Sequence, residues 1–291
     1  MNSPRTILIT GARGQLARAL ALAAPPQIKI VPLEHTDLDI CDADAVRAAL
    51  ETHRPDWVFN GAAYNLVDKA ETEGARAALE INALGPAVLA AACRDAGARL
   101  VHFSTDFVFN GTKTSPYEED DPTHPLGVYA ASKLCGENVV LAASPHHLVI
   151  RVCRLFGPVE AQTQKPGGNF PLLMLKLGRE RGKVRVVDDQ IGSPSYTPDL
   201  ARGVWQLLKR AEGGVFHLSN DGEVSFADYA QEIFHIAGVE CEVECVSSAD
   251  YGAPAARPLY STLSNSKAHS FGVTPLRHWR EALREFLESH S

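Results

Sequence analysis

The sequence predicts an α/β protein in which a doubly wound parallel sheet is followed by a smaller C-terminal lobe. Up to about residue 150, short β-branched runs alternate with alanine-rich stretches, which is typical of βαβ units. A glycine-rich turn separates the first run from the first alanine-rich stretch. The 291 residues are 45% hydrophobic and 22% charged, the composition of a compact globular chain.

The first βαβ unit shows these signals most clearly. Residues 6–10 are predicted as the first strand, and residues 11–14 form a turn that leads into a helix over 15–24. The pair Pro25-Pro26 ends that helix, because proline lacks the N–H that the next helical hydrogen bond requires. Residues 28–33 are predicted as the second strand.

The glycine-rich turn has the spacing and position of a dinucleotide-binding fingerprint. Gly11 permits the tight turn, Gly14 lets a pyrophosphate approach the N-terminus of the helix, and small Ala17 lets helix and strand pack closely. A glycine-rich turn is often only a turn. One that follows a first strand and opens a helix favours cofactor binding, so the sequence predicts a Rossmann domain.

The remaining elements of this domain continue the alternation. Asp42 is a suitable N-cap for the next helix, because its carboxylate can accept hydrogen bonds from the first turn. Helices are predicted over 43–52, 75–97 and 130–142, and strands over 57–60, 100–103 and 147–152. The result is a doubly wound sheet of five or more strands.

Beyond Phe156 the regular alternation weakens, which indicates a second lobe. The segment 157–169 is rich in Pro, Gly and Gln and is predicted as a loop. Helices are predicted over 170–181, 199–210, 226–237 and 276–288, and strands over 184–187 and 214–218. We assign 1–155 to the dinucleotide-binding domain, with segments around 188–218 contributing to it, and 156–291 mainly to a smaller substrate-binding lobe.

Charge and cysteine content exclude several classes of partner. The formal charge is −7, from 28 basic and 35 acidic residues without a basic cluster, so we expect no nucleic acid and no membrane as partner. No window approaches the roughly 20 apolar residues of a membrane span. The six cysteines lack metal-binding spacing, which predicts reduced thiols in a cytoplasmic protein. His146 and His147 lack a third ligand, so we expect a surface pair and no metal site.

The sequence leaves the choice between NADH and NADPH open. An acidic residue after the second strand would bind the ribose 2′-hydroxyl of NAD, whereas a basic residue would favour the 2′-phosphate of NADP. Glu34 lies near the end of the second strand, but Arg13 in the glycine turn is within reach of a 2′-phosphate. Asp39 and Ile40 lie where an adenine would be bound. A solvated surface position is the alternative for Arg13.

Tyr129 and Lys133 stand four residues apart on a predicted helix, so their side chains share one face. An ammonium beside a tyrosine can stabilise the phenolate, while the lysine holds a cofactor ribose. Such pairs are common by chance. Thr105, however, follows the fourth strand at the sheet edge where ligands bind, and could hold a substrate oxygen beside Tyr129. The order of glycine turn, hydroxyl and Tyr/Lys helix predicts an oxidoreductase site.

These motifs resemble those of the extended short-chain dehydrogenase/reductases, and within them the dTDP-4-dehydrorhamnose reductase family. The resemblance runs end to end and implies a large nucleotide-binding domain with a small C-terminal domain that closes over a nucleotide-sugar. It is carried by Thr10 to Leu16, Leu38 to Ile40, Asn60 to Tyr64, Val67 to Glu71, Asn82, Phe103 to Gly111, Pro116, Tyr117, Pro125 to Tyr129, Ser132 to Glu137, Gly168 to Phe170, Asp189, Gln190, Gly192, Pro194, Ala256 to Pro258 and Trp279.

The resemblance also implies roles for single residues. The catalytic positions are Thr105, Tyr129 and Lys133. The expected cofactor contacts are Gly11, Gly14, Gln15, Leu16, Asp39, Ile40, Ala62, Ala63, Tyr64, Tyr129 and Lys133, to which its position in the turn adds Arg13. The expected substrate contacts are Val67, Thr105, Asp106, Phe107, Tyr129, Arg154, Asn169 and Arg257, the last of these suited to a diphosphate.

The main departure from the family follows Arg151. The family usually has Thr-Ser-Trp there, with the tryptophan near the sugar, whereas this chain has Val152-Cys153-Arg154. A flat apolar surface is thus replaced by a cation. We expect Arg154 to hydrogen-bond a sugar hydroxyl or a phosphate; the alternative is that it turns outward or pairs with a carboxylate near the lobe boundary. The three catalytic positions are unaffected, so the departure concerns the sugar and not the type of reaction.

The sequence therefore predicts NAD(P)H-dependent reduction of the 4-keto group of a nucleotide-activated deoxysugar. The resemblance favours the conversion of dTDP-4-dehydro-L-rhamnose to dTDP-L-rhamnose. Tyr129 is expected to donate the proton, Thr105 to orient the carbonyl oxygen, and Lys133 to fix the cofactor ribose and lower the tyrosine pKa. A reductase of another nucleotide-linked keto-sugar and a catalytically silent nucleotide-binding regulatory homologue are the alternatives, and a homodimer is left open.

Overall fold

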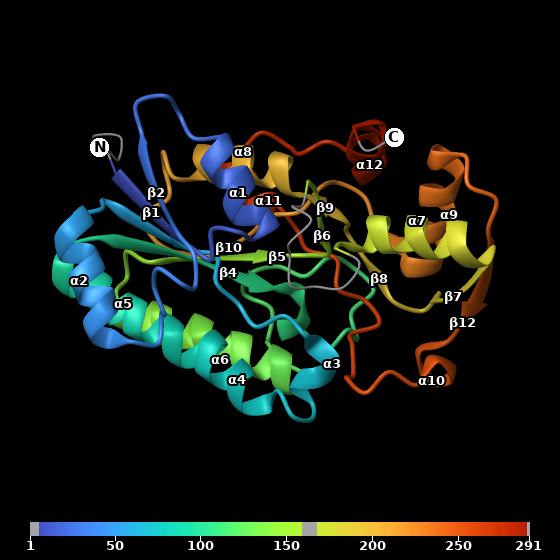
Figure 1. Cartoon of the computed structure of the whole chain (residues 1–291), viewed down its shortest axis with the longest axis horizontal. Helices are drawn as coiled ribbons and strands as arrows, with labels where there is room; N and C mark the ends of the chain where they lie inside the picture. The colour runs from blue at the N-terminus through green and yellow to red at the C-terminus, as the bar shows by residue number, and fades with distance from the viewer. Residues whose placement is uncertain (1–5, 159–167, 290–291) are drawn as a thin grey trace.

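In the computed structural model, a parallel six-stranded sheet lies between two layers of helices, and a second group of elements packs at one end of it (Figure 1). The structure describes residues 6–158 and 168–289. The strands run in the order β10-β5-β4-β3-β1-β2, all parallel, which confirms the doubly wound fold class. Their bounds are β1 Thr6–Thr10, β2 Lys29–Leu33, β3 Trp57–Asn60, β4 Arg99–Thr105, β5 Leu148–Val152 and β10 Gly214–His217.

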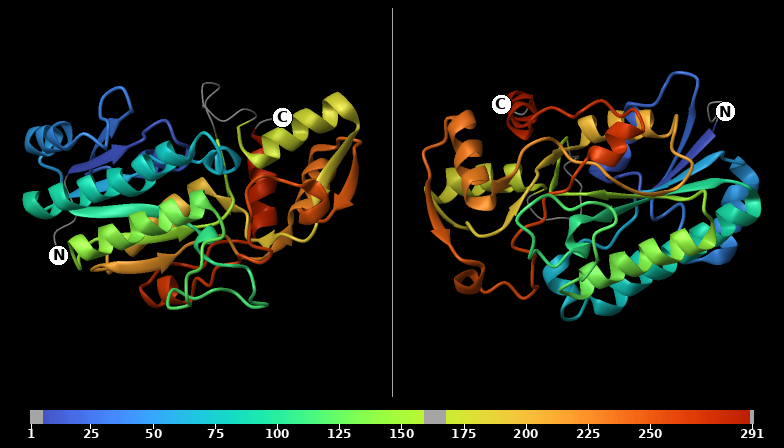
Figure 2. Two further views of the ribbon diagram at one scale, coloured as in Figure 1. Left: turned by 90° about the horizontal axis from the view of Figure 1, so that it is seen from below. Right: turned by 180° about the vertical axis from the view of Figure 1, so that it is seen from behind.

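Helices cover both faces of the sheet, and each face has its own apolar core. One face carries α1 (Gln15–Leu22), α8 (Thr197–Leu207) and α11 (Ser266–Ser270), and the other carries α2 (Ala43–His53), α5 (Gly85–Ala96) and α6 (Val128–Ala143). Ile7 and Ile9 of β1 belong to the first core and Leu8 to the second, because successive side chains of a strand point to opposite faces. Figure 2 shows α5 and α6 side by side across the sheet.

The second group of elements has a separate, aromatic-rich core that includes Phe156, Tyr229, Trp279 and Phe286. It lies beyond the carboxyl ends of the sheet strands (Figures 1 and 2). Its longer elements are α7 (Phe170–Arg181), β7 (Lys183–Val187), α9 (Phe226–Ala237), β12 (Glu242–Val246) and α12 (Trp279–Glu288). Its shorter elements are the pairs β6 (Leu155–Phe156) with β9 (Ser195–Tyr196) and β8 (Ile191–Gly192) with β11 (Val224–Ser225), and α10 (Ser248–Tyr251).

The helix predicted over 75–97 is interrupted. It consists of α4 (Ala75–Leu79), a π-helical turn η1 (Glu80–Leu84), and α5. Asn82 in η1 accepts a hydrogen bond from Tyr64 N at 2.9 Å and donates to Ser132 Oγ at 3.0 Å. The wider π-helical turn thus places the Asn82 side-chain amide between α6 and the loop after β3. Single π-helical turns inside α-helices are frequent at functional sites.

Two further features differ from what the sequence predicts, and one prediction lies mostly outside the described residues. β12 was not predicted, because Glu242-Val243-Glu244 alternates polar and apolar residues over too short a run, and it is stabilised by parallel pairing with β7. His147 is not a surface residue. It is buried, its Nδ1 accepts from Leu100 N at 3.2 Å, and its Nε2 lies 3.1 Å from Ala90 O. The loop predicted over 157–169 falls mostly outside the described residues.

One stretch of the described residues is long and apolar enough to cross a membrane by length and composition. It covers residues 75–96, has a mean hydropathy of 1.2, and 39% of its most apolar window is buried. The expectation that no such window exists is therefore wrong by this measure. In the structure this stretch packs on α2 and α6, with Leu89, Ala90 and Cys93 in the core, as a covering helix of an α/β sheet does.

Candidate active site

The glycine turn presents backbone rather than side chains to the start of α1. Gly11 has a φ of +62°, and a Cβ there would lie 2.6 Å from Ala62 N, so only glycine fits. Gly14 is the N-cap of α1 and makes no side-chain cap bond, and the first turn contains no acidic residue. The N–H groups at this helix end are therefore available to an anion, which fits the pyrophosphate of a dinucleotide.

Gln15 and Leu16 open α1 in different ways. The Gln15 amide donates to Leu155 O at 3.4 Å and lies 3.5 Å from the Asn169 amide, so it connects the two groups of elements. Leu16 is buried in the core beneath the helix. A contact between Leu16 and a cofactor would therefore be made by the Leu16 backbone. The sequence alone does not show whether such a contact is made by backbone or by side chain.

The residues expected at the adenosine end lie beside β2. Arg13 Nε and Glu34 Oε2 form an ion pair at 2.7 Å, with side chains 58% and 35% exposed. Asp39 accepts a hydrogen bond from Cys41 N at 2.9 Å, and Ile40 is buried against Gly85. Arg13 and Glu34, which predict opposite cofactor preferences, thus contact each other.

The loop after β3 holds Ala62, Ala63 and Tyr64 beside the glycine turn. Ala62 N donates to Asn60 Oδ1 at 3.2 Å, and Tyr64 is held by Asn82. Asn60 and Asn82 were not predicted as site residues. A polar residue that ends a buried strand, as Asn60 does, is the signal that could have identified the first of them.

Thr105 and Tyr129 meet at the carboxyl end of β4. Thr105 Oγ1 donates to Asp106 Oδ1 at 3.0 Å and accepts from Phe107 N at 3.2 Å. The Tyr129 ring packs edge-on against Phe107 at 6.1 Å between centroids. Burial and the Asp106 carboxylate raise the pKa of Tyr129 to about 12, against the effect of its hydrogen bond with Thr105. The expectation that Lys133 lowers this pKa is not met in this structure.

Lys133 lies one turn further along α6 and is buried. Its Nζ donates to Phe103 O at 2.6 Å and lies 3.4 Å from His102 Nε2. Burial lowers the pKa of Lys133 to about 8, although the Glu137 carboxylate acts in the opposite direction. Both groups of the Tyr/Lys pair thus titrate far from their ordinary values, as is typical of functional sites.

Asp106 is the buried carboxylate beneath this cluster. Besides Thr105, the Cys153 thiol donates to it, with Sγ 3.0 Å from Oδ2. Burial raises the pKa of Asp106, while hydrogen bonds from Ser261, Cys153 and Thr105 and the charge of Arg154 lower it in part. The residues that replace Thr-Ser-Trp therefore lie directly behind the catalytic positions.

Arg154 is half-buried and has a φ of +44°, which is rare for a residue with a Cβ. Its guanidinium lies 3.9 Å from the centre of the Phe226 ring, and its terminal nitrogens donate to Val224 O at 2.8 Å and Gln190 O at 2.9 Å. Within the described part of the chain, its buried Nε has no hydrogen-bond partner. Arg154 does not turn outward, and no carboxylate of residues 6–158 or 168–289 lies at hydrogen-bond distance from it.

The remaining expected substrate contacts line the junction of the two groups of elements. Val67 begins the short helix α3 (Val67–Ala70), in which Asp68 forms a bidentate ion pair with Arg257, both oxygens lying 2.9 Å from Nη2. Burial works against it, but the Arg257 charge and hydrogen bonds lower the pKa of Asp68. Asn169 caps α7 and donates to Gly157 O at 2.7 Å.

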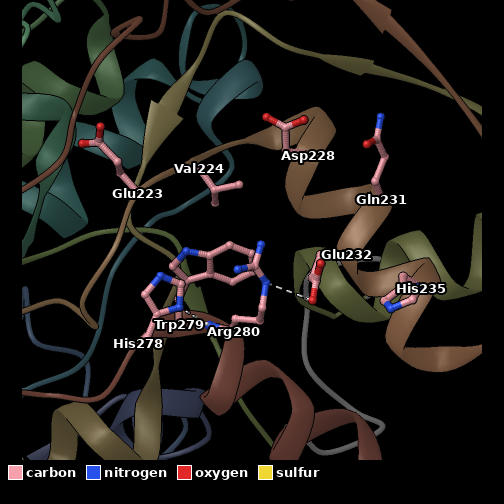
Figure 3. A pocket seen from close by; sticks show the side chains of 9 residues that line it. All are labelled: Glu223, Val224, Asp228, Gln231, Glu232, His235, His278, Trp279 and Arg280. Atoms are coloured by element: carbon pink, nitrogen blue, oxygen red, sulfur yellow. Dashed lines mark hydrogen bonds and ion pairs between the residues drawn. The ribbon is translucent and has the colours of Figure 1, made fainter.

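A cavity of about 560 Å³ lies elsewhere, between α9, β11 and α12. Figure 3 shows Glu223, Val224, Asp228, Gln231, Glu232, His235, His278, Trp279 and Arg280 around it. Arg280 pairs with Glu232 at 3.0 Å, and Glu223 accepts from Tyr260 Oη at 2.6 Å. None of the predicted site residues lines it. Among residues 6–158 and 168–289, no group of three or more His, Cys, Asp or Glu side chains is arranged to hold a metal.

Comparison with known proteins identifies the family. Residues 5–291 match the family model described as RmlD substrate binding domain. The spore coat polysaccharide biosynthesis protein SpsK of Bacillus subtilis is 39% identical over 286 residues, 98% of each chain. The dTDP-4-dehydrorhamnose reductase of Mycobacterium tuberculosis is 43% identical over 284 residues, which cover 95% of this chain and 90% of that one.

Among solved structures, the dTDP-4-dehydrorhamnose reductase of Bacillus anthracis, crystallised with NADP, superimposes with a TM-score of 0.92. It is 35% identical, and the match covers 99% of this chain and 100% of that one. The similarity thus extends over the sheet and the second group of elements alike. The chain belongs to the RmlD substrate binding domain family, to which its resemblance to dTDP-4-dehydrorhamnose reductases had pointed.

Proposed function

We propose that this protein is an NADPH-dependent or NADH-dependent reductase of the 4-keto group of a nucleotide-activated deoxysugar. The favoured conversion is that of dTDP-4-dehydro-L-rhamnose to dTDP-L-rhamnose. The observation that carries the proposal is that Thr105 and Tyr129 both contact Phe107 at the carboxyl end of β4, with Lys133 one helical turn from Tyr129. The names of the two reductases that the chain resembles support the substrate class.

The cofactor would lie along the glycine turn and across the sheet edge. Gly11, Gly14 and the first N–H groups of α1 suit the pyrophosphate, and Arg13 suits the adenosine end. Lys133 suits the ribose next to the nicotinamide. When bound, the nicotinamide supplies the hydride that the carbonyl carbon accepts.

Tyr129 would supply the proton to the developing alkoxide. Its raised pKa keeps the phenol protonated at neutral pH, so the proton is present when it is needed. The Thr105 hydroxyl would orient the carbonyl oxygen, for which its proton must turn from Asp106 toward the substrate. Asp106 thus holds the hydroxyl in place before the substrate arrives.

The substrate would bind between the sheet domain, which we assign to 1–155 with contributions from around 188–218, and the lobe formed mainly by 156–291. Val67, Asp106 and Phe107 would line the sugar from the first side, and Arg154, Asn169 and Arg257 from the second. Free thiols at all six cysteines suit the reducing cytoplasm, where we place the reaction.

A cofactor-oxidation assay against dTDP-, UDP- and GDP-linked 4-keto sugars tests the proposal. We expect turnover with a dTDP-linked substrate and a product in which only the C4 carbonyl has been reduced, as observed by NMR of the purified product. Turnover only of another nucleotide-linked keto-sugar would favour the alternative that Arg154 suggests. Cofactor binding without turnover of any of them would favour a silent homologue, although a silent protein has no chemical reason to retain Thr105, Tyr129 and Lys133.

Arg13 is expected to create a preference for NADPH over NADH. Removing the cation in Arg13→Ala should abolish that preference, since a hydrogen bond to a charged group contributes about 1.5–3 kcal/mol, or roughly tenfold or more in Kd. Glu34→Gln should strengthen the preference, because it removes the carboxylate that now binds Arg13 at 2.7 Å. Dissociation constants for both cofactors measure this. An equal NADPH to NADH ratio in wild type and Arg13→Ala would remove Arg13 from the site.

Arg154→Ala is expected to lower kcat/KM for the best sugar about 10- to 150-fold with unchanged cofactor affinity. This corresponds to losing one charged hydrogen bond of about 1.5–3 kcal/mol. Steady-state kinetics and cofactor titrations provide both numbers. Arg154→Lys keeps the positive charge but loses the two hydrogen bonds to the carbonyl oxygens of Gln190 and Val224. It therefore separates the effect of the charge from the effect of these hydrogen bonds. If kcat/KM fell by less than threefold in Arg154→Ala, Arg154 would have only a structural role, which is to hold Gln190 and Val224 in place.

A further inference from the structure

Four buried polar side chains form a continuous chain behind the candidate catalytic residues. Thr10, at the end of β1, donates from Oγ1 to Asn60 Oδ1 at 2.8 Å. Asn60, at the end of β3, contacts His102 of β4, with Nδ2 3.1 Å from Nδ1. The other ring nitrogen, His102 Nε2, lies 3.4 Å from Lys133 Nζ. The chain thus crosses three strands and ends on the lysine of the Tyr/Lys pair.

The orientation of the Asn60 amide determines the tautomer of His102. Asn60 Oδ1 receives two donors, the Thr10 hydroxyl and the Ala62 N–H at 3.2 Å, so the oxygen must face them. Its Nδ2 is then a donor to His102 Nδ1. A neutral imidazole that accepts at Nδ1 has its proton on Nε2. Burial and the Lys133 charge hold the pKa of His102 well below its usual range, so the ring is neutral.

The Nε2–H of His102 consequently points at Lys133 Nζ. An ammonium has three donors and no lone pair, so it meets this N–H as donor against donor, whereas a neutral amine accepts from it. Lys133 also donates to Phe103 O at 2.6 Å, which a neutral amine can still do. Within the part of the chain that the structure describes, Glu137 is the charged group that acts on the pKa of Lys133. Glu137 on α6 favours the ammonium, but it is engaged by Arg151 of β5 through two nitrogens.

We infer that Asn60 and His102 are positioning residues that aim an N–H at Lys133 Nζ and so disfavour its ammonium form. Lys133 then carries its proton only up to mildly alkaline pH, and a ligand group that accepts a hydrogen bond from Nζ restores the charge. Its consequence for turnover rests on the proposed function, because Lys133 matters there as the partner of Tyr129 and of the cofactor ribose. The tautomer and the titration of Lys133 do not depend on that function.

The first test uses the whole protein labelled with ¹⁵N and ¹³C, without cofactor. Long-range correlations from the ring protons of His102 report which nitrogen carries the proton, and we expect Nε2. The Cε signal of Lys133, assigned by comparison with Lys133→Arg, is followed against pH. A ring protonated at Nδ1 would overturn the inference whether or not any sugar is turned over.

The second test removes the opposing N–H. In His102→Leu, we expect the titration of Lys133 and the alkaline limb of the kcat profile to move up by about one pH unit, a tenfold change in proton affinity. His147→Leu is the matched control: it removes another buried histidine that bridges Leu100 N and Ala90 O, and should move neither the Lys133 titration nor the alkaline limb.

Asn60→Asp provides a variant of nearly unchanged volume in case the leucine variant does not fold. Its carboxylate accepts from Nδ1–H, which turns Nε2 into an acceptor and raises the Lys133 titration too. An unmoved titration in the folded variants would overturn the inference.

Discussion

Tyr129→Phe should fold normally and lose turnover by about 10²- to 10⁴-fold, the contribution of a positioned general acid. The variant removes one hydroxyl and leaves the ring in its edge-on contact with Phe107. The proton for the alkoxide would then have to come from water. The loss should lie in kcat with the best sugar of the panel, while the cofactor Kd stays within a few-fold of wild type.

The matched control is Tyr251→Phe, which removes the hydroxyl of an exposed tyrosine in α10. This variant should have the wild-type rate. Far-UV circular dichroism and thermal unfolding would verify that both variants are folded. Near wild-type turnover in Tyr129→Phe would show that the proton comes from another group and would remove Tyr129 from the mechanism.

Glu137→Ala should destabilise the protein by about 3–5 kcal/mol, because it leaves a buried guanidinium without its counter-charge. Arg151 binds Glu137 with Nε at 3.0 Å and Nη2 at 2.7 Å, and both side chains are at most 5% exposed. Arg151 also lies 5.1 Å from the centre of the Phe109 ring. Urea unfolding measures the loss.

Two comparisons make this prediction specific. The double variant Glu137→Leu/Arg151→Met should be more stable than Glu137→Ala, since apolar side chains that replace both charges leave none unpaired. Glu80→Ala breaks the exposed ion pair with Arg76, at 2.7 Å, and should leave the urea midpoint unchanged. If Glu137→Ala had the same midpoint as Glu80→Ala, the Arg151 charge would have to be compensated by other groups.

Much of the fold could be predicted from the sequence in both groups of elements, because its signals are local. The strand 57–60 and the helices 170–181 and 226–237 are found with the predicted bounds, since each has a clear apolar period and a proline, glycine or serine at an end. Short pairs such as β6 with β9 were not predicted. Two residues have no periodicity, and they form strands only because distant segments supply their partners.

The sequence predicts candidate site residues but not the electrostatics around them. The spacing of Tyr129 and Lys133 places both on α6, yet it says nothing of Asp106, which lies behind Tyr129 and helps to raise its pKa. The sequence shows only that Glu34 lies near the end of the second strand and Arg13 in the glycine turn, whereas in the structure the two form an ion pair. Tertiary contacts of this kind carry no local pattern. The roles of these residues toward cofactor and sugar stay predictions.

The place of β10 at the edge of the sheet has a consequence for the order in which the protein is built during translation. β10 pairs with β5, yet α7, β7 and α8 are synthesised between them, and α8 covers the face on which α1 lies. When the ribosome has released only the first five strands, the core on that face still lacks Leu200, Val204 and Leu207 of α8. The first half of the chain therefore cannot complete its core until residues of the second half have been synthesised. Domains often fold N-terminal first during synthesis, but here the N-terminal half can fold only in part before the rest follows.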